Sequence, residues 1–318
     1  MTTLDHISEE IQKAKSIVIL THESPDGDAM GSSLAMYLAL KKIEKDVDVV
    51  IPEYSKTYTF LPGADEIKKE GRTEKYDLAI AVDCADLKRL NGFANYFEDA
   101  THTISIDHHS INTMFGEYNF VDPASPACCQ ILIIVLEFLK IEITKEIGTC
   151  LLTGIITDTG GFKYPGVTAE TFEFVAWLLN RGINVSSIYK KALQIKTRAN
   201  FELSRLGMDR IEFLENGKIA FTYINQDDFE KFGAEPGSHE GIVEIGRDVE
   251  GVEVSIFLHQ KESGVYKVSL RSNDYVNVAD ICLMFGGGGH VRAAGCQMQG
   301  DIEQIKEKLV KEIKKALK

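Results

Sequence analysis

The chain carries the sequence TISIDHH at residues 103–109. Its first four residues are typical of a short buried strand, and the three that follow are a carboxylate and two imidazoles. These polar groups are costly to remove from water unless something binds them. A second polar cluster, of His22, Asp26 and Asp28, follows the apolar stretch at 16–21. Two such clusters at strand ends predict a shared metal site, and therefore a hydrolase rather than a passive domain.

Short apolar runs alternate with loops and helical patterns in the first part of the chain. Strands are predicted at 16–21, 47–51, 77–82 and 103–106. Helices are predicted at 31–42, 125–140 and 144–157, and from 168 to just before Gly182, with Ser125 and Thr168 as N-caps. This order is typical of an α/β fold with a doubly wound, mainly parallel sheet, in which ligands bind beyond the carboxyl ends of the strands. Asp83 and both polar clusters are expected at that edge.

The pattern changes after a charged, mostly helical stretch at about 184–210. Two hairpin signals, a glycine-rich run and a final helix from Asp301 predict a smaller α+β domain. The expected organisation is a catalytic metal-binding domain at 1–185, a helical linker at 186–210 and a substrate-binding domain at 211–318.

Composition limits the classes of partner. The 318 residues carry a net charge of −13, whereas a protein that grips a long duplex through many phosphates should be basic. An acidic chain can still bind a small phosphorylated substrate if metal ions supply positive charge. No apolar run approaches the roughly 20 residues of a membrane span, and there is no signal-peptide pattern. The lack of a long apolar run predicts no membrane partner. The six cysteines form no CxxC pair, which predicts a reducing cytoplasm.

The candidate metal ligands are carboxylates and imidazoles: His22, Asp26, Asp28, Asp83, His108 and Asp158. A ligand set without sulfur favours Mn²⁺, Mg²⁺ or Fe²⁺ over structural zinc. So many ligands favour two ions roughly 3.5–4 Å apart, with Asp83 as the bridge because its strand should be central. Taken singly, Asp83 is readable as a turn residue, and Asp28 as the cap of a helix beginning near Gly31. These readings become improbable together, since every one would have to coincide at one sheet edge.

These motifs resemble those of the DHH phosphoesterase superfamily, which takes its name from the Asp-His-His found here at 107–109. The stretch from His22 to Ser32 matches the family pattern His-x-x-x-Asp-x-Asp-x-x-Gly-Ser. Val82-Asp83 matches its second motif, and TDTG at 157–160 its fourth. The glycine run ending at His290 is similar to the DHHA1 domain that accompanies many members. Length and layout resemble the NrnA-type subgroup most.

The resemblance implies an Mn²⁺-dependent enzyme with two ions, with Mg²⁺ or another divalent ion left open. It would degrade short oligoribonucleotides to nucleoside 5′-monophosphates, and some members remove the 3′-phosphate from 3′-phosphoadenosine 5′-phosphate (pAp). By motif, one ion would be held by His22, Asp26 and Asp83, and the other by Asp28, Asp83, His108 and Asp158. Asp107 and His109 would orient ligands or face the phosphate, and either His109 or water would protonate the leaving 3′-oxygen.

Glycines let backbone N–H groups approach a phosphate, because no Cβ intervenes. Arginines add charge that pairs with a terminal phosphate. The candidate substrate-binding residues are Ser32, Arg89, Arg271, Gly287, Gly288, Gly289, His290 and Arg292. The glycine run is also readable as a plain loop, and Arg89 and Arg292 as solvated surface charges.

Two alternative functions stay open at this point. One is a phosphodiesterase for cyclic di-AMP or linear pApA, and the other is a regulatory module that binds nucleotide without turnover. The second is disfavoured because no motif position is missing. Hydrolysis of a panel of short RNA, pAp and cyclic di-AMP separates these functions. A homodimer is one assembly that the sequence leaves open.

Overall fold

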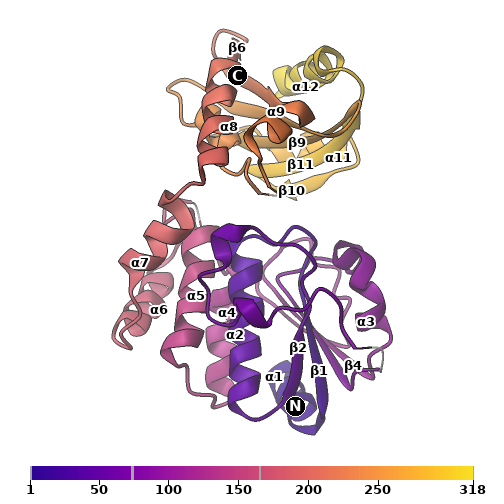
Figure 1. The fold of residues 1–318 in the computed structure, drawn as a ribbon, viewed down its shortest axis with the longest axis vertical. Helices are drawn as coiled ribbons and strands as arrows, with labels where there is room; N and C mark the ends of the chain where they lie inside the picture. The colour runs from indigo at the N-terminus through magenta and orange to yellow at the C-terminus, as the bar shows by residue number, and fades with distance from the viewer. Residues whose placement is uncertain (1, 73–74, 165, 236, 318) are drawn as a thin grey trace. The chain divides into compact units, whose positions relative to one another are not determined.

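In the computed structural model, residues 2–72, 75–164, 166–235 and 237–317 are described. The chain forms two compact units, 1–195 and 196–318, and each is considered by itself (Figure 1).

The first unit contains, among the described residues, a five-stranded sheet in the order β2-β1-β3-β4-β5. All its neighbouring strands are parallel. The strands are β1 (Ser16–Leu20), β2 (Asp46–Val49), β3 (Leu78–Val82), β4 (His102–Asp107) and β5 (Tyr118–Val121). The predicted doubly wound α/β sheet is therefore confirmed, and β3 occupies its centre. The chain leaves β1 in one direction to β2 and returns on the other side to β3, so the strand order reverses between β1 and β3.

Helices cover both faces of this sheet because alternate strand residues point to opposite sides. Ile17 and Ile19 of β1 belong to the core beneath α1, α2, α4 and α5, whereas Val18 and Leu20 pack with Leu90 on the opposite face. Figure 1 shows α2, α4 and α5 grouped on one side and α3 on the other. The helices are α1 (Thr3–Lys13), α2 (Gly27–Lys42), α3 (Ala94–Glu98), α4 (Cys128–Phe138), α5 (Lys145–Asp158) and α6 (Ala169–Leu179).

Two helix starts differ from the sequence prediction. Helix α2 begins at Gly27 rather than Gly31, because the Asp26 side chain accepts from the amides of Asp28 and Ala29 and caps it. Helix α4 begins at Cys128 with Ala127, not Ser125, at the N-cap position. The Ser125 hydroxyl instead donates to the Ala127 carbonyl. Thr168 caps α6 as predicted, and Thr144 caps α5.

The segment predicted as a linker contains two sets of helices. Helix α7 (Val185–Tyr189) and a π-helix at Lys190–Gln194 contact α5 within the first unit. Helix α8 (Arg198–Asp209) contacts β7 and α9 within the second unit.

The second unit contains a six-stranded sheet in the order β10-β11-β9-β8-β7-β6, in the part of the chain that the structure describes. Its strands are β6 (Glu212–Leu214), β7 (Ile219–Ile224), β8 (Val254–Glu262), β9 (Val265–Ser272), β10 (Gly288–His290) and β11 (Ala293–Gln299). Only β7 and β8 pair in parallel, so the two predicted hairpins and the α+β class are confirmed. Helices α11 (Val278–Leu283) and α12 (Ile302–Ala316) cover one face, and α8, α9 (Gln226–Phe232) and α10 (Ile242–Arg247) the other.

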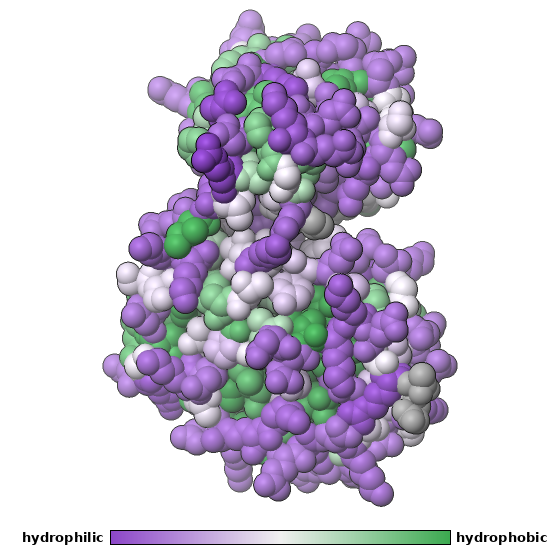
Figure 2. Space-filling view, in the orientation of Figure 1, coloured by the Kyte–Doolittle hydropathy of each residue, from purple (hydrophilic) through white to green (hydrophobic). Residues whose placement is uncertain are grey.

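The visible surface is mainly hydrophilic (Figure 2). Figure 2 shows polar side chains over most of the visible face of both units, with smaller apolar areas between them. Within the described ranges, no helix combines the length and apolar character that a membrane crossing requires.

Candidate metal centre

The polar side chains singled out in the first part of the sequence meet at the carboxyl edge of the parallel sheet. His22 follows β1, Asp83 follows β3, and His108 follows β4, while Asp158 ends α5. These strands flank the point where the strand order reverses, which is where ligands bind in open α/β sheets. Three groups of side chains lie within 4.8 Å of one another: His22 with Asp26 and Asp83, Asp28 with His108 and Asp158, and Asp83 with His108 and His109.

The imidazole of His22 is fixed by the backbone beside it. Its Nδ1 lies 2.8 Å from the carbonyl oxygen of Glu23, so Nδ1 carries the proton. Its Nε2 is directed toward the cluster, 3.9 Å from Oδ2 of Asp83. Asp26 uses Oδ1 to cap α2, accepting from two backbone amides. A carbonyl partner that orients an imidazole is the usual companion of a metal-bound histidine.

His108 is held in a similar way. Its Nδ1 lies 3.2 Å from the carbonyl oxygen of Ser125. Its Nε2 lies 3.4 Å from Oδ2 of Asp158 and 3.5 Å from Oδ1 of Asp83. Burial raises the pKa of Asp158, and the carboxylates of Asp28 and Asp26 raise it further. Imidazole nitrogens and carboxylate oxygens from three elements therefore converge on a small volume.

Asp28 is placed by a helix that begins 100 residues further along the chain. Its Oδ2 accepts from the amide of Cys128 at 2.6 Å, and its Oδ1 from the amide of Cys129 at 3.0 Å. Since Ala127 has no capping side chain, Asp28 supplies the acceptors at the N-terminus of α4. A Cβ on Gly154 would lie 2.4 Å from Asp28 Oδ1, so glycine is required for this approach.

Of the residues in this cluster, Asp83 gives the strongest indication of a cation site. Its side chain is only 3% exposed, and its Oδ1 has no hydrogen-bond partner among the described residues. Its φ of 52° lies in the left-handed region, which costs a residue with a Cβ about 1 kcal/mol or more. Burial raises the pKa of Asp83 well above its usual range, and the carboxylates of Asp28, Asp26 and Asp158 raise it further. A buried unpartnered oxygen amid other carboxylates fits a bound cation.

The donor set contains oxygen and nitrogen but no sulfur. Two cysteines, Cys128 and Cys129, lie beside Asp28. Cys128 Sγ donates to the carbonyl of Ile106, and Cys129 Sγ donates to that of Asp28. Burial raises the pKa of both thiols well above the usual range, so they stay protonated. None of the candidate metal groups in the described ranges includes a cysteine. This donor set suits Mn²⁺ or Mg²⁺ better than a thiolate zinc site.

Asp107 and His109 form a hydrogen-bonded pair beside the cluster. The Asp107 side chain is fully buried, and its Oδ1 lies 2.7 Å from Nδ1 of His109. Its Oδ2 accepts from the side-chain amide of Asn112 at 2.7 Å. Burial alone would raise the pKa of Asp107, but the hydrogen bonds from His109 and Asn112 outweigh burial and lower it. An ionised Asp107 therefore keeps a proton on Nδ1 of His109.

The two candidate substrate residues of the first unit lie in different surroundings. Ser32 is completely buried within α2, and its hydroxyl donates to the carbonyl of Ala29. Arg89 is half-buried, and its charge acts on His22. The Arg89 guanidinium makes no hydrogen bond or ion pair with any described residue, which leaves its donors available to a phosphate.

The arginines predicted in the second unit have partners within that unit. Arg271 Nε lies 2.9 Å from Oε1 of Glu244. Arg292 donates to the carbonyls of Val276 and Asp274. Both side chains are partly exposed, so each can also face solvent.

The glycine run divides into two parts: Gly286 lies in a turn, whereas Gly288 and Gly289 belong to an edge strand, β10, which pairs with β11. A Cβ on Gly287 would lie 2.2 Å from the carbonyl of Gly295, and one on Gly289 2.5 Å from that of Ala293. Gly288 faces open space, and His290 is exposed at the end of the strand. Two of these glycines are therefore needed for strand packing, and one presents bare backbone.

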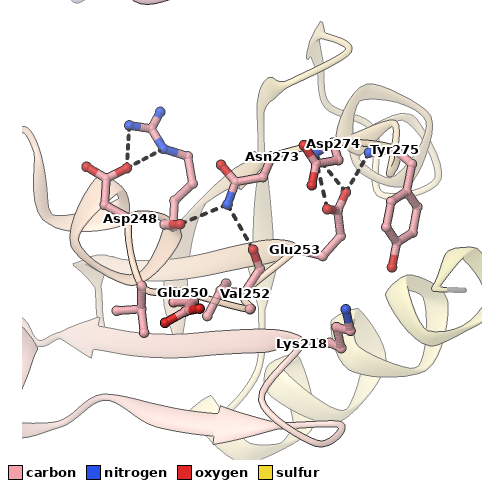
Figure 3. Close-up of a pocket in the computed structure, with 11 residues that line it drawn as sticks. Lys218, Asp248, Glu250, Val252, Glu253, Asn273, Asp274 and Tyr275 are labelled. Atoms are coloured by element: carbon pink, nitrogen blue, oxygen red, sulfur yellow. Dashed lines mark hydrogen bonds and ion pairs between the residues drawn. The ribbon is translucent and has the colours of Figure 1, made fainter.

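The second unit also has an open pocket of about 380 Å³ (Figure 3). Figure 3 shows that Glu253 points at the backbone of 274–275, and Arg247 pairs with Asp248. Asn273 donates to the carbonyls of Arg247 and Val252. Glu253, Arg247 and Asn273 thus bond to other groups of the pocket wall rather than pointing free into the pocket.

Several residues of the centre were not predicted from the sequence. The carbonyls of Glu23 and Ser125 and the amides of Cys128 and Cys129 carry no side-chain signal at all. The start of a helix near Ser125 was the only hint that amide donors lay there. Asn112, five residues after Asp107, also went unrecognised, because a single asparagine in a loop resembles any turn residue.

Comparisons with known proteins agree with this geometry. The model of the DHH family, N-terminal domain, matches residues 16–155, and that of the DHHA1 domain matches 216–318. The chain is 35% identical, over 95% of its length and 90% of the relative, to the bifunctional oligoribonuclease and PAP phosphatase NrnA of Thermus thermophilus. It is 25% identical to the protein of the same name in Bacillus subtilis, over 89% of both chains. A crystal structure of an exopolyphosphatase-related protein from Bacteroides fragilis superposes with a TM-score of 0.89 at 27% identity, covering 97% of this chain and 96% of that one.

Proposed function

The chain belongs to the DHH family and carries the DHHA1 domain, and from this we propose that it hydrolyses short oligoribonucleotides to nucleoside 5′-monophosphates. Removal of the 3′-phosphate from pAp would be a second activity of the same centre, as the names of the relatives suggest. The observation that carries the proposal is the buried Oδ1 of Asp83, which lacks a partner amid converging carboxylates and imidazoles.

The ligand assignment follows the two groups around Asp83. His22, Asp26 and Asp83 would hold one ion, and Asp28, Asp83, His108 and Asp158 would hold the other, with Asp83 shared by both. Mn²⁺ is the ion we propose, because oxygen and imidazole ligands suit it, and Mg²⁺ is the comparison. When bound, such ions activate water and neutralise phosphate charge.

The protein's own residues supply orientation and a proton. Asp107 accepts a hydrogen bond from Nδ1 of His109 and fixes the orientation of that ring. Nε2 of His109 would donate the proton that the leaving 3′-oxygen requires, with water as the alternative donor. Arg89 would pair with a phosphate oxygen of the substrate.

The second unit would bind the rest of the substrate. Gly288 presents backbone without a Cβ on the edge strand β10, next to the exposed His290. Arg271 and Arg292 would contribute charge, although each already has partners within the unit. The acidic net charge argues against a long duplex as substrate. All six cysteines, which lie within the described ranges, are free thiols, in keeping with the cytoplasmic location that we propose.

The test is a hydrolysis assay on three substrates: a ladder of short RNA, pAp and cyclic di-AMP. The protein is first treated with EDTA and then supplied with Mn²⁺, Mg²⁺ or no metal. We expect 5′-monophosphates from the shortest RNA with Mn²⁺, and no product without metal. Activity that survives exhaustive chelation would refute the metal assignment. Preferential hydrolysis of cyclic di-AMP would replace the proposed substrate with a cyclic dinucleotide.

A further inference from the structure

Asn112, in the loop between β4 and β5, bonds to the centre through its side-chain amide. Its Nδ2 donates to Asp107 Oδ2 at 2.7 Å and to the carbonyl of Cys84 at 3.2 Å. Its Oδ1 accepts from the amide of Met114 at 2.7 Å. Each polar atom of this side chain therefore has a partner, and two of the three partners adjoin proposed metal ligands.

These contacts connect the loops that follow β3 and β4. Cys84 directly follows Asp83, and Asp107 directly precedes His108. The backbone repeats the link one residue later, where the amide of Thr113 donates to the carbonyl of Ala85 at 2.9 Å. A shift of the Asn112 side chain would therefore disturb the spacing between the two loops.

The bond from Asn112 also completes the hydrogen bonding of the Asp107 carboxylate. Its Oδ1 is bonded by His109 and its Oδ2 by Asn112, so neither oxygen is left unpaired in a fully buried position. With only one of these bonds the carboxylate could rotate, and the ring of His109 would rotate with it. Only an amide side chain suits the position, because it must donate to two acceptors and accept from one amide.

We propose that Asn112 is a positioning residue, which fixes Asp107 and through it sets the orientation of the His109 ring. The inference rests on the proposed function, because it assigns His109 to the reacting phosphate. It does not require Asn112 to touch substrate or metal. Removing a partner of this kind typically lowers activity about 10–100-fold.

A double-mutant cycle tests the proposal with a diribonucleotide as substrate and saturating Mn²⁺. Asn112→Ala should lower kcat about tenfold with KM nearly unchanged. In a His109→Ala background the same change should lower kcat by less than about twofold, because the residue through which it acts is already absent. Asn119→Ala is the matched control, since the side chain of Asn119, among the described residues, hydrogen-bonds only the backbone of Gly116. It should retain near-wild-type kcat.

If the kcat losses of Asn112→Ala and His109→Ala simply multiply in the double variant, the proposal is overturned. An unchanged kcat in Asn112→Ala would also overturn it. A second measurement does not depend on the substrate. With histidines labelled in ¹⁵N, the metal-free wild type and Asn119→Ala should both show His109 protonated at Nδ1. Asn112→Ala should show a mixture of tautomers, and an unchanged spectrum would refute the role. If the wild type cleaves neither RNA nor pAp, the proposed function fails, and the spectra still decide whether Asn112 fixes His109.

Discussion

Asp83 combines a left-handed backbone, near-complete burial and an unpartnered carboxylate oxygen. Each of these features is unfavourable in a protein without bound metal, and a cation offsets the last two. The sequence predicted this residue as the bridge because its strand should be central, and β3 is the central strand. The bridging role itself stays a prediction.

Asp83→Asn should therefore separate stability from metal binding. We expect the variant, in EDTA, to be about 1 kcal/mol more stable than the wild type, because a buried charge facing other carboxylates is removed. The wild type should gain stability on addition of Mn²⁺, and the variant should gain much less. Thermal melting with and without Mn²⁺ measures both effects. An equal metal-dependent gain in the two proteins would contradict the bridging role.

Gly154 tests how closely Asp28 must approach α5. In Gly154→Ala the new Cβ would lie 2.3 Å from Cys129 Sγ and 2.4 Å from Asp28 Oδ1, so one of them must move. We expect a loss of about 1–3 kcal/mol in stability and weaker Mn²⁺ binding. Gly148 lies in the same helix as Gly154, and Gly148→Ala serves as the control because its Cβ crowds Ile183 instead. It should destabilise the fold without changing Mn²⁺ affinity; similar affinity losses in both variants would refute the specific role.

At this scale, side chains in motifs were predictable and their backbone partners were not. His22 and His108 were identified from their place after strands. The carbonyls of Glu23 and Ser125 that orient them depend on the paths of loops, which tertiary packing decides. The same limit applies to Arg292, whose donors reach the carbonyls of 274 and 276. Sequence shows a cation there, but not which acceptors surround it.

At the scale of elements, helix α4 shows why boundaries were less predictable than types. Ser125-Pro126 has the usual composition of a helix start. The helix begins at Cys128 instead, because Asp28 supplies the acceptors that a capping side chain would otherwise provide. A cap that comes from a distant residue leaves no local signal. The short strand β5 was missed for a related reason, since its packing against neighbouring elements outweighs a weak local pattern. Helix α1 was missed although Thr2 and Asp5 form a capping box at its start, which is a local signal in the sequence.

The packing of the turn at 237–241 on β8 in the second unit makes a pH prediction. The rings of His239 and His259 lie 4.2 Å apart, and the Nδ1 of each is buried without a partner among the described residues. Burial lowers the pKa of His239 to about 3, helped by His259, Lys267 and Lys261. Burial also lowers the pKa of His259 to about 4, helped by Lys261 and Lys267. Both rings are therefore neutral in the folded protein near neutral pH.

The sign of the effect follows from proton binding. An unfolded histidine has a pKa of about 6.5, so below that value the unfolded state binds more protons than the folded state. The stability that these rings contribute is present above pH 6.5 and is lost as pH falls toward about 4. Hydrogen exchange of the amides of β8 in the full chain should accelerate over that window. His259→Phe should reduce the acceleration, whereas the same change at the exposed His290 should not; no difference between them would contradict the assignment.

At the scale of the whole chain, the order of elements was predictable and the details of binding were not. Alternating strands and helices, followed by hairpins, indicated two units of different class, and the structure confirms both classes. From the sequence alone, the acidic net charge argues against a long duplex as substrate, and a ligand set without sulfur argues against a structural zinc site. We propose that substrate choice depends on side chains of the second unit, such as Arg271 and Arg292, whose surroundings are set by tertiary packing and not by a motif.

We propose that the first unit binds a pair of divalent ions at the carboxyl edge of its sheet. A titration of the chelator-treated full-length protein with Mn²⁺, with bound metal counted by electron paramagnetic resonance, tests this. We expect about two ions per chain, magnetically coupled because they lie roughly 3.5–4 Å apart, and loss of the coupling in Asp83→Asn. A stoichiometry near zero, or two uncoupled ions unaffected by Asp83→Asn, would refute the proposal.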